Sequence, residues 1–208
     1  MIWLLDRLYN LHWVGDGAAR SAQPYLGFYR PWLAAHGFKS VINLRGENIQ
    51  RGWWRREKAL CQSLGIKHFD VRLSSRRLPL PAMLAALFDA FEQAPLPVLF
   101  KCSGGQDRTS FAAALYLLHT RGTGTLQEAE AQFAAWPYLH LPKRHQDWLK
   151  LFPRFAVEDA DGMGLTEWAR TRYSPERLEQ WLTKRGLERS HQGIQKPDPE
   201  RKIGRKPA

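Results

Sequence analysis

A short loop between an apolar run and a helix-favouring run constrains the fold of this chain more than any other feature. The loop spans residues 101–109 (KCSGGQDRT), follows the apolar residues 98–100 and leads directly into the mainly apolar residues 110–118. Its two adjacent glycines allow backbone angles that side chains forbid, as a tight turn requires. A strand that enters a helix through a tight turn is typical of α/β folds, in which such loops lie at the carboxyl ends of the strands.

The residue types of this loop fit the chemistry of a bound phosphoryl group. Cys102 opens the loop, Arg108 closes it and Thr109 follows. Thiols ionise more readily beside helix N-termini and cations, and both are expected at Cys102. Gly104 and Gly105 allow successive N–H groups to face an anion, and the arginine fork matches two phosphate oxygens. We therefore expect the Cys102 thiolate to attack phosphorus and form a cysteinyl-phosphate, which is then hydrolysed. Thr109 is expected to donate a hydrogen bond to the sulfur or to a later oxyanion.

The loop resembles the signature of the cysteine-based protein phosphatase superfamily, which is Cys-x5-Arg followed by serine or threonine. Two upstream stretches, 20–24 (RSAQP) and 37–45 (GFKSVINLR), are similar in order and spacing to compact dual-specificity and bacterial tyrosine phosphatase-like proteins. The resemblance covers roughly residues 12–140. It implies an α/β fold with a central, mostly parallel sheet flanked by helices, and phosphate-monoester hydrolysis without a cofactor or metal. It also implies the phosphate-binding set Ser103, Gly104, Gly105, Gln106, Asp107 and Arg108.

Three other interpretations of the loop are open. Cys102 could be a small buried residue in an ordinary strand-to-helix turn, as free cysteines usually are. A rhodanese-type sulfur carrier also uses a cysteine loop of this size, but the two upstream stretches favour the phosphatase. A non-catalytic phosphate-binding module is the third alternative. Against it, both Cys102 and Arg108 are present, whereas decayed phosphatases usually lack one of them.

Two aspartates are candidates for the residue that protonates the leaving group. The family usually supplies an aspartate from the loop before the helix that precedes the cysteine strand, but the corresponding residues 74–79 (SSRRLP) contain no carboxylate. Asp107 resembles the loop aspartate of myotubularin-like lipid phosphatases; alternatively it only accepts N–H groups of the loop or helix. Asp70, on the polar face of the preceding strand, is a second candidate, with a solvated strand residue as its alternative. A third alternative is that neither aspartate donates the proton. The choice depends on the geometry of the site, which the sequence does not show.

Several basic residues flank the predicted site. Lys101 stands where the family usually has histidine, and it is either a cation beside the sulfur or a paired lysine. Arg45 follows a strand at its carboxyl end and either rims the pocket or forms a structural ion pair. Arg20 belongs to the resembling motif, but no catalytic role can be assigned to it. Arg76 and Arg77 lie in the loop expected to overhang the site, where they recruit acidic substrates or are simply solvated.

The expected partner is a phosphorylated protein or a small phosphate ester. Phosphoinositide phosphatases often carry lysines inside the loop, whereas Ser103 and Gln106 are neutral here. This favours phosphotyrosine or a simple ester, while the match at Asp107 supports a lipid phosphatase as the alternative. Cys61 is expected in the core, with a role as resolving partner for oxidised Cys102 as the weaker reading. No nucleic-acid partner is expected, and the oligomeric state is not readable from the sequence.

Bulk properties predict one phosphatase domain with extensions. The 208 residues are 44% hydrophobic and carry a net charge of +11, much of it beyond Lys184. The N-terminus lacks the features of a signal peptide and no apolar run approaches 18 residues, so a cytoplasmic location is expected. We expect a phosphatase domain at 1–155, a packed helical extension at 156–188 and a disordered basic tail at 189–208. For this tail, a solvated state is favoured over membrane contact.

Hydrophobic periodicity and turn residues predict the order of the elements. Strands are expected at 12–14, 40–44, 66–73 and 98–100, with a turn at 20–24. Helices are expected at 25–36, 50–64, 81–93, 126–136 and 143–152, and from residues 109 and 175 onward.

Overall fold

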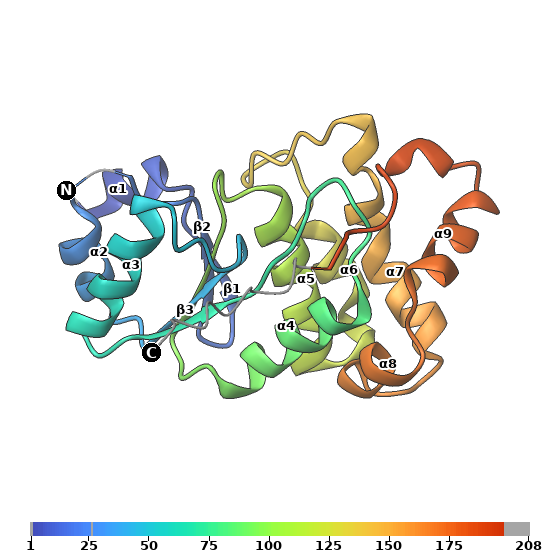
Figure 1. Cartoon of the computed structure of the whole chain (residues 1–208), viewed down its shortest axis with the longest axis horizontal. Helices are drawn as coiled ribbons and strands as arrows, with labels where there is room; N and C mark the ends of the chain where they lie inside the picture. The colour runs from blue at the N-terminus through green and yellow to red at the C-terminus, as the bar shows by residue number, and fades with distance from the viewer. Residues whose placement is uncertain (1, 26, 198–208) are drawn as a thin grey trace, which may run out of the picture.

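A five-stranded sheet forms the centre of the computed structural model, which describes residues 2–25 and 27–197 (Figure 1). Its strands are β1 (His12–Gly15), β2 (Ala18–Ser21), β3 (Ser40–Asn43), β4 (Lys67–Asp70) and β5 (Val98–Lys101). They are ordered β1-β2-β5-β3-β4. β1 is antiparallel to β2, and the other three pairings are parallel. This arrangement confirms the predicted mostly parallel α/β sheet.

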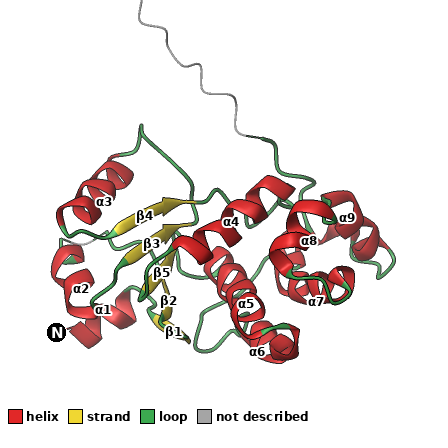
Figure 2. Cartoon of the chain, turned by 90° about the horizontal axis from the view of Figure 1, so that it is seen from below, coloured by secondary structure: helices red, strands yellow, loops and turns green. Residues whose placement is uncertain are grey.

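Helices cover both faces of this sheet (Figure 2). On one face lie α1 (Ile2–Leu8), α2 (Tyr29–His36) and α3 (Gly52–Ser63). On the other side lie α4 (Pro81–Gln93), α5 (Asp107–Arg121), α6 (Leu126–Ala131), α7 (Trp148–Ala160), α8 (Leu165–Thr171) and α9 (Pro175–Thr183).

The central strand β5 is buried on both faces because each face packs against its own hydrophobic core. Leu99 contributes to a smaller core with the helices α1, α2 and α3, whereas Val98 and Phe100 contribute to a larger core on the opposite face. Successive side chains of a strand point to opposite faces, so three consecutive apolar residues serve two cores. The strand that precedes the cysteine loop is therefore held from both sides.

Four elements in particular differ from the sequence-based expectation: β2, α1, α8 and α5. β2 occupies part of the segment expected as a turn, and its four residues are all buried, including the charged Arg20. Neither α1 nor α8 was predicted, because each has only 7 residues and too few turns for a clear period. α5 begins at Asp107, two residues earlier than expected, and a carboxylate in the first turn suits the positive end of the helix dipole.

The C-terminal helices pack against the rest of the fold. α7 runs continuously through the expected limit at residue 155, and Trp168 and Leu178 of the expected extension lie in the larger core. The structure also contains no helix that is long and apolar enough to cross a membrane within the described ranges.

Residues 191–197, which we call the C-terminal strap, correct part of the expected disordered tail. The strap runs back from α9 and forms a parallel bridge between Ile194 and Leu78 (Figure 1). The N–H of Gln192 donates to the carbonyl of Arg76 at 2.7 Å, and the N–H of Gln195 donates to the carbonyl of Leu78 at 2.8 Å. Backbone pairing of this kind needs no periodic side-chain pattern, so hydrophobic periodicity does not predict it. Residues 198–208 of the expected tail lie outside the described part.

Candidate active site

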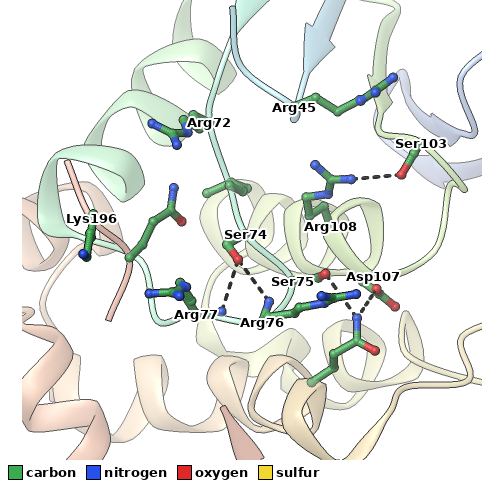
Figure 3. Close-up of a pocket in the computed structure, with 13 residues that line it drawn as sticks. Arg45, Arg72, Ser74, Ser75, Arg76, Arg77, Ser103, Asp107, Arg108 and Lys196 are labelled. Carbon is green, nitrogen blue, oxygen red and sulfur yellow. Dashed lines mark hydrogen bonds between the residues drawn. The ribbon is translucent and has the colours of Figure 1, made fainter. Parts of the chain in front are cut away.

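The parallel strands bring four loops to one edge of the sheet. The cysteine loop follows β5, Gln23 lies beyond β2, Arg45 follows β3, and the segment with Arg76 follows β4. The backbones of Arg45 and Arg72 form an isolated bridge, which ties two of these loops together. A pocket of about 800 Å³ opens at this edge and is lined by residues of the cysteine loop, the 72–77 segment and the strap (Figure 3).

The backbone of the cysteine loop is arranged to receive an anion. Asn10 Nδ2 donates to the Gly105 carbonyl at 2.9 Å, and the N–H of Gln23 donates to the Ser103 carbonyl at 3.1 Å. By contrast, the N–H groups of residues 103–106 have no acceptor among the described residues. Ser103 and Gly104 are exposed, whereas Gly105 is buried. Successive N–H groups without an internal acceptor form an anion-binding nest. The loop therefore has its carbonyls anchored and its donors available.

Arg20 supplies most of the anchoring. Its guanidinium is fully buried, and Nη2 donates to the carbonyls of Gly105 and Gln106, each at 3.2 Å, and to Ser110 Oγ at 2.6 Å. The same guanidinium lies over the ring of Tyr138, 4.4 Å from its centroid. Burial lowers the pKa of Arg20 to about 10, which leaves it charged at neutral pH. The role that the sequence could not assign is thus a positioning role: Arg20 holds the outer side of the loop.

Gly105 shows how tightly the loop rests on β2. Its φ is +65°, in the left-handed region, and a Cβ built there would lie 2.4 Å from the backbone nitrogen of Ala22 and 2.7 Å from the carbonyl carbon of Ser21. No side chain fits at that distance. Glycine is therefore required here both for conformation and for space.

The expected nucleophile and phosphate-binding arginine occupy opposite ends of the loop. Cys102 is buried, and its N–H donates to the Ser21 carbonyl at 3.4 Å. Arg108 lines the pocket and donates to Ser103 Oγ at 3.0 Å (Figure 3). The Thr109 hydroxyl donates to the Gln106 carbonyl at 3.0 Å, and its expected hydrogen bond to the sulfur or to a later oxyanion stays a prediction. In this arrangement Thr109 also braces the loop.

Asp107 projects into the pocket from the first turn of α5 and is held by residues of a distant segment. Gln146 Nε2 donates to its Oδ2 at 2.6 Å and also to Ser75 Oγ at 3.1 Å (Figure 3). His140 Nε2 lies 3.6 Å from Asp107 Oδ1. His140 Nδ1 lies 3.2 Å from the carbonyl of Phe133, and a carbonyl only accepts, so Nδ1 carries the hydrogen. Burial lowers the pKa of His140 despite the opposing charge of Asp107, and a neutral ring then turns a lone pair toward the carboxyl group.

Asp70 is separated from this pocket and lines a neighbouring depression instead. Its Oδ1 accepts hydrogen bonds from Asn43 Nδ2 at 2.7 Å and from Trp54 Nε1 at 2.9 Å. Burial alone would raise the pKa of Asp70, but the neighbouring His68, 3.6 Å away, and the hydrogen bonds from Asn43 and Trp54 outweigh it and lower the pKa to about 2. A carboxyl group with this pKa is ionised at neutral pH and has no proton to give.

Lys101 has the paired environment that was one of its two expected readings. It is fully buried, and its Nζ lies 2.6 Å from Glu57 Oε1 and donates to Gln23 Oε1 at 2.7 Å. Burial lowers the pKa of Lys101, and the charge of Glu57 opposes this. The positive charge beside the cysteine loop is therefore matched by a buried carboxylate.

Arg45 and Arg76 both line the pocket, as expected for residues that follow β3 and β4. The Arg45 guanidinium stacks on the ring of Trp53, 3.6 Å from its centroid, and donates to Tyr25 Oη at 3.2 Å. Cys61, by contrast, lies in the smaller core on the other face of the sheet from Cys102. Burial raises the pKa of the Cys61 thiol to about 12, so this group stays a protonated core residue.

Sequence reasoning missed the residues that hold the site from a distance: Asn10, Gln23, Glu57, His140 and Gln146. Gln23 lies in the 20–24 stretch that resembles the family, and the other four belong to no recognisable motif. The contact between Asn10 and Gly105 spans 95 residues of sequence, and the contact between Gln146 and Asp107 spans 39. The one available signal was the position of Glu57, which lies three residues after Trp54 and four before Cys61, on the buried face of α3. A charged residue at such a position needs a buried partner.

Comparison with known proteins gives matches only at the level of structure. No family model matches the chain, and no curated protein matches its sequence. A putative phosphatase from Shewanella putrefaciens CN-32 aligns with a TM-score of 0.54 at 19% identity, over 73% of this chain and 97% of that one. TpbA from P. aeruginosa aligns with a TM-score of 0.51 at 17% identity, over 86% and 93%. The Siw14 catalytic core, a protein of S. cerevisiae, aligns with a TM-score of 0.51 at 17% identity, over 86% and 92%. At these identities the likeness establishes the fold, and the chain has the fold of the cysteine-based phosphatases.

Proposed function

We propose that this protein is a cysteine-dependent phosphatase that hydrolyses phosphate monoesters. The observation that carries the proposal is the cysteine loop itself, whose N–H groups at residues 103–106 have no acceptor among the described residues while its carbonyls are anchored. Cys102 begins this loop, Arg108 lies at its other end, and α5 directs its positive end toward it. The phosphatase fold and the resemblance of the loop to the family signature support the same chemistry.

The reaction follows from these positions. The phosphoryl oxygens bind the free N–H groups and the Arg108 guanidinium, which together match the charge that spreads over them in the transition state. The Cys102 thiolate attacks phosphorus in line, so that a P–S bond forms as the P–O bond to the leaving group breaks. The leaving oxygen takes a proton from Asp107. Water then attacks the cysteinyl-phosphate, returns its proton to Asp107, and releases inorganic phosphate and the thiolate.

Asp107 is the proton donor that the geometry supports. Its hydrogen bond comes from the side chain of Gln146, and among the described residues no backbone N–H of α5 donates to it, which weakens the capping alternative. His140 turns the lone pair of a neutral ring toward its other oxygen. Asp70 is ionised and lies outside the pocket.

Turnover of nitrophenyl phosphate tests the proposed class. We expect the wild type to hydrolyse it and Cys102→Ser to be inactive, because serine is not ionised at neutral pH. Cys61→Ala is the matched control: its thiol lies on the other face of the sheet, so this variant retains turnover. A wild type that binds phosphate without turning over the ester would instead identify a non-catalytic phosphate-binding module.

The dependence on the leaving group tests Asp107. Nitrophenolate is a weak base and hardly needs a proton, whereas an alkoxide or tyrosyl oxygen does. Asp107→Asn keeps the shape of the side chain, and we expect it to slow hydrolysis of an alkyl or tyrosyl phosphate about 10²- to 10⁴-fold. Nitrophenyl phosphate should be slowed far less. Equal slowing of both esters would show that Asp107 serves the structure of the loop rather than proton transfer.

Within this class, phosphotyrosine or a simple ester is the substrate that the neutral residues Ser103 and Gln106 favour. A phosphoinositide or another highly charged ester is the second candidate. One structural observation favours it: the pocket receives cationic side chains from segments outside the cysteine loop, including Arg76, Arg77 and Lys196.

A further inference from the structure

The pocket above the cysteine loop is far more basic than one phosphate group requires. Its cationic side chains are Arg45, Arg72, Arg76, Arg77, Arg108 and Lys196. Asp107 is the one carboxylate among the described residues that line it. Figure 3 shows that these cations are spread across the pocket: Arg45 and Arg108 lie near Ser103, whereas Arg77 and Lys196 lie on the opposite side.

Backbone pairing brings the strap, which carries Lys196, alongside the segment that carries Arg77, although the two are far apart in sequence. The N–H of Leu78 donates to the Gly193 carbonyl at 3.0 Å, and this pairing fixes the strap against the residues next to Arg77. Ser74 Oγ accepts from the N–H of Arg77 at 3.2 Å and so shapes the turn. The two cations are therefore presented by ordered backbone and not by free chain ends. Neither side chain has an ion-pair partner among the described residues.

The charge of a single phosphate group is already met at the other side of the pocket. A phosphate monoester carries about −1.5 to −2 at neutral pH. The free N–H groups of the loop, the N-terminus of α5 and Arg108 receive it. Arg77 and Lys196 lie on the opposite side of the pocket and have no counter-charge among the described residues, so a second anion would attract both of them. At about 800 Å³ the pocket lies in the upper part of the range of ligand pockets, roughly 300–1,000 Å³.

The lining also argues against an aromatic or peptide-like substrate. Among the described residues that line the pocket, Leu73 is the one hydrophobic side chain. The ring of a phosphotyrosine would find few apolar partners there, whereas hydroxyl and phosphate groups would find many donors. The neutral Ser103 and Gln106 point to a weakly charged substrate only if the loop supplies all the cations. The structure shows that the 72–77 segment and the strap supply them instead.

We propose that Arg77 and Lys196 form a second phosphate subsite, and that the substrate is a small polyol carrying at least two phosphate groups. One phosphate binds the cysteine loop and is hydrolysed, while another binds the Arg77–Lys196 subsite and orients the molecule. The polyol is either free or the head group of a lipid, since both present the same phosphates to the pocket. This proposal rests on the proposed phosphatase activity and specifies its substrate.

Steady-state kinetics on matched substrates tests the subsite. We would compare kcat/KM for inositol monophosphate and inositol bisphosphates with that for the corresponding dioctanoyl phosphoinositides. The wild type should prefer the bisphosphates. Arg77→Gln/Lys196→Gln should lower kcat/KM for a bisphosphate at least about tenfold more than for a monophosphate, because hydrogen bonds to charged groups are lost. Lys184→Gln removes a charge just after α9, outside the pocket, and is the control for net charge.

The possible results separate the subsite from the catalytic proposal. Loss of preference in the double variant with a preserved melting temperature supports the subsite, and the ratio of lipid to free substrate identifies which form is used. Equal effects on mono- and bisphosphates, or no preference in the wild type, overturn the subsite while nitrophenyl phosphate turnover leaves the phosphatase intact. A preference for acidic phosphotyrosine peptides over every polyol phosphate also overturns it. Absence of turnover on all esters refutes the phosphatase itself.

Discussion

The buried pair Glu57–Lys101 yields the sharpest prediction about how this site is supported. Glu57 is only 1% exposed, and its carboxylate accepts from His68 at 2.9 Å and from Gln23 at 2.7 Å in addition to Lys101 at 2.6 Å. Burial alone would raise the pKa of Glu57, but the hydrogen bond from His68 and the charge of Lys101 lower it. Lys101 is the last residue of β5 and immediately precedes Cys102. The buried pair therefore fixes the position at which the cysteine loop begins.

We expect Glu57→Gln to destabilise the protein by about 3–5 kcal/mol. Gln keeps the shape of the side chain but leaves the Lys101 ammonium buried without its counter-charge, and removing one partner of a buried pair has this cost. Lys101→Met should cost less, because His68 still donates to Glu57. In the double variant Glu57→Gln/Lys101→Met both charges are gone, so it should be more stable than Glu57→Gln alone. The effects of the two substitutions are therefore strongly non-additive.

Urea unfolding at pH 7, followed by tryptophan fluorescence, measures these free energies. Glu167→Gln, an exposed position on α8, is the matched control and should change the unfolding free energy by less than about 0.5 kcal/mol. pH adds a second check. Burial alone would lower the pKa of His68, but hydrogen bonds to Asp70 and Glu57 raise it. In Lys101→Met, protonated His68 still neutralises the charge of Glu57. The loss of unfolding free energy in this variant should therefore grow as pH rises through the raised pKa of His68. A cost below about 1 kcal/mol for Glu57→Gln, or simple additivity, would refute the reasoning.

Two further predictions concern the backbone of the loop and the carboxylate beside it. Gly105→Ala should destabilise the protein by more than about 1–2 kcal/mol and weaken phosphate binding, because left-handed strain adds to the contact with the Ala22 backbone nitrogen. Gly104→Ala, whose Cβ would meet only the Gln106 side chain at 3.8 Å, should have a much smaller effect in the same melting and binding assays. Asp70→Asn should cost about 2 kcal/mol at pH 7, since its folded pKa of about 2 lies below the ordinary 3.8. That stability is present above the ordinary pKa and is lost as pH falls toward 2. In urea unfolding, the difference in unfolding free energy between wild type and Asp70→Asn should therefore narrow below about pH 4. A difference that stays constant with pH would contradict this prediction.

The sequence predicted those parts of the molecule that are encoded locally. The β5–loop–α5 unit is contiguous, and its apolar run, paired glycines and arginine were sufficient to place it. α4 was predicted at its observed limits, because Pro81 marks its start and its apolar residues have a clear helical period. β2 was not recognised because Arg20 is charged, and a charged residue argues against a buried strand unless its partners are known. Those partners, the carbonyls of the cysteine loop, are separated from Arg20 by 85 residues or more.

The same limit explains why the substrate could not be inferred from the loop alone. The cations that line the pocket come from four separate segments, and Lys196 reaches it only because the strap pairs with Leu78. The neutral residues Ser103 and Gln106 of the cysteine loop therefore do not determine the total charge of the pocket. The charge of the pocket is a property of the tertiary arrangement.

Lys101 is a cation beside Cys102, but its charge is neutralised by Glu57 and not by the sulfur. A cation next to Cys102 suggests direct stabilisation of a thiolate, but the Lys101 ammonium lies 2.6 Å from the Glu57 carboxylate, so the pair has little net field at the sulfur. Negative charge on Cys102 and on a bound phosphate must then be stabilised by groups whose charge is not compensated. These are the free N–H groups of the loop, the N-terminus of α5 and Arg108. It follows that the double variant Glu57→Gln/Lys101→Met should lose much less turnover than Arg108→Lys, whose single ammonium cannot reproduce the arginine fork.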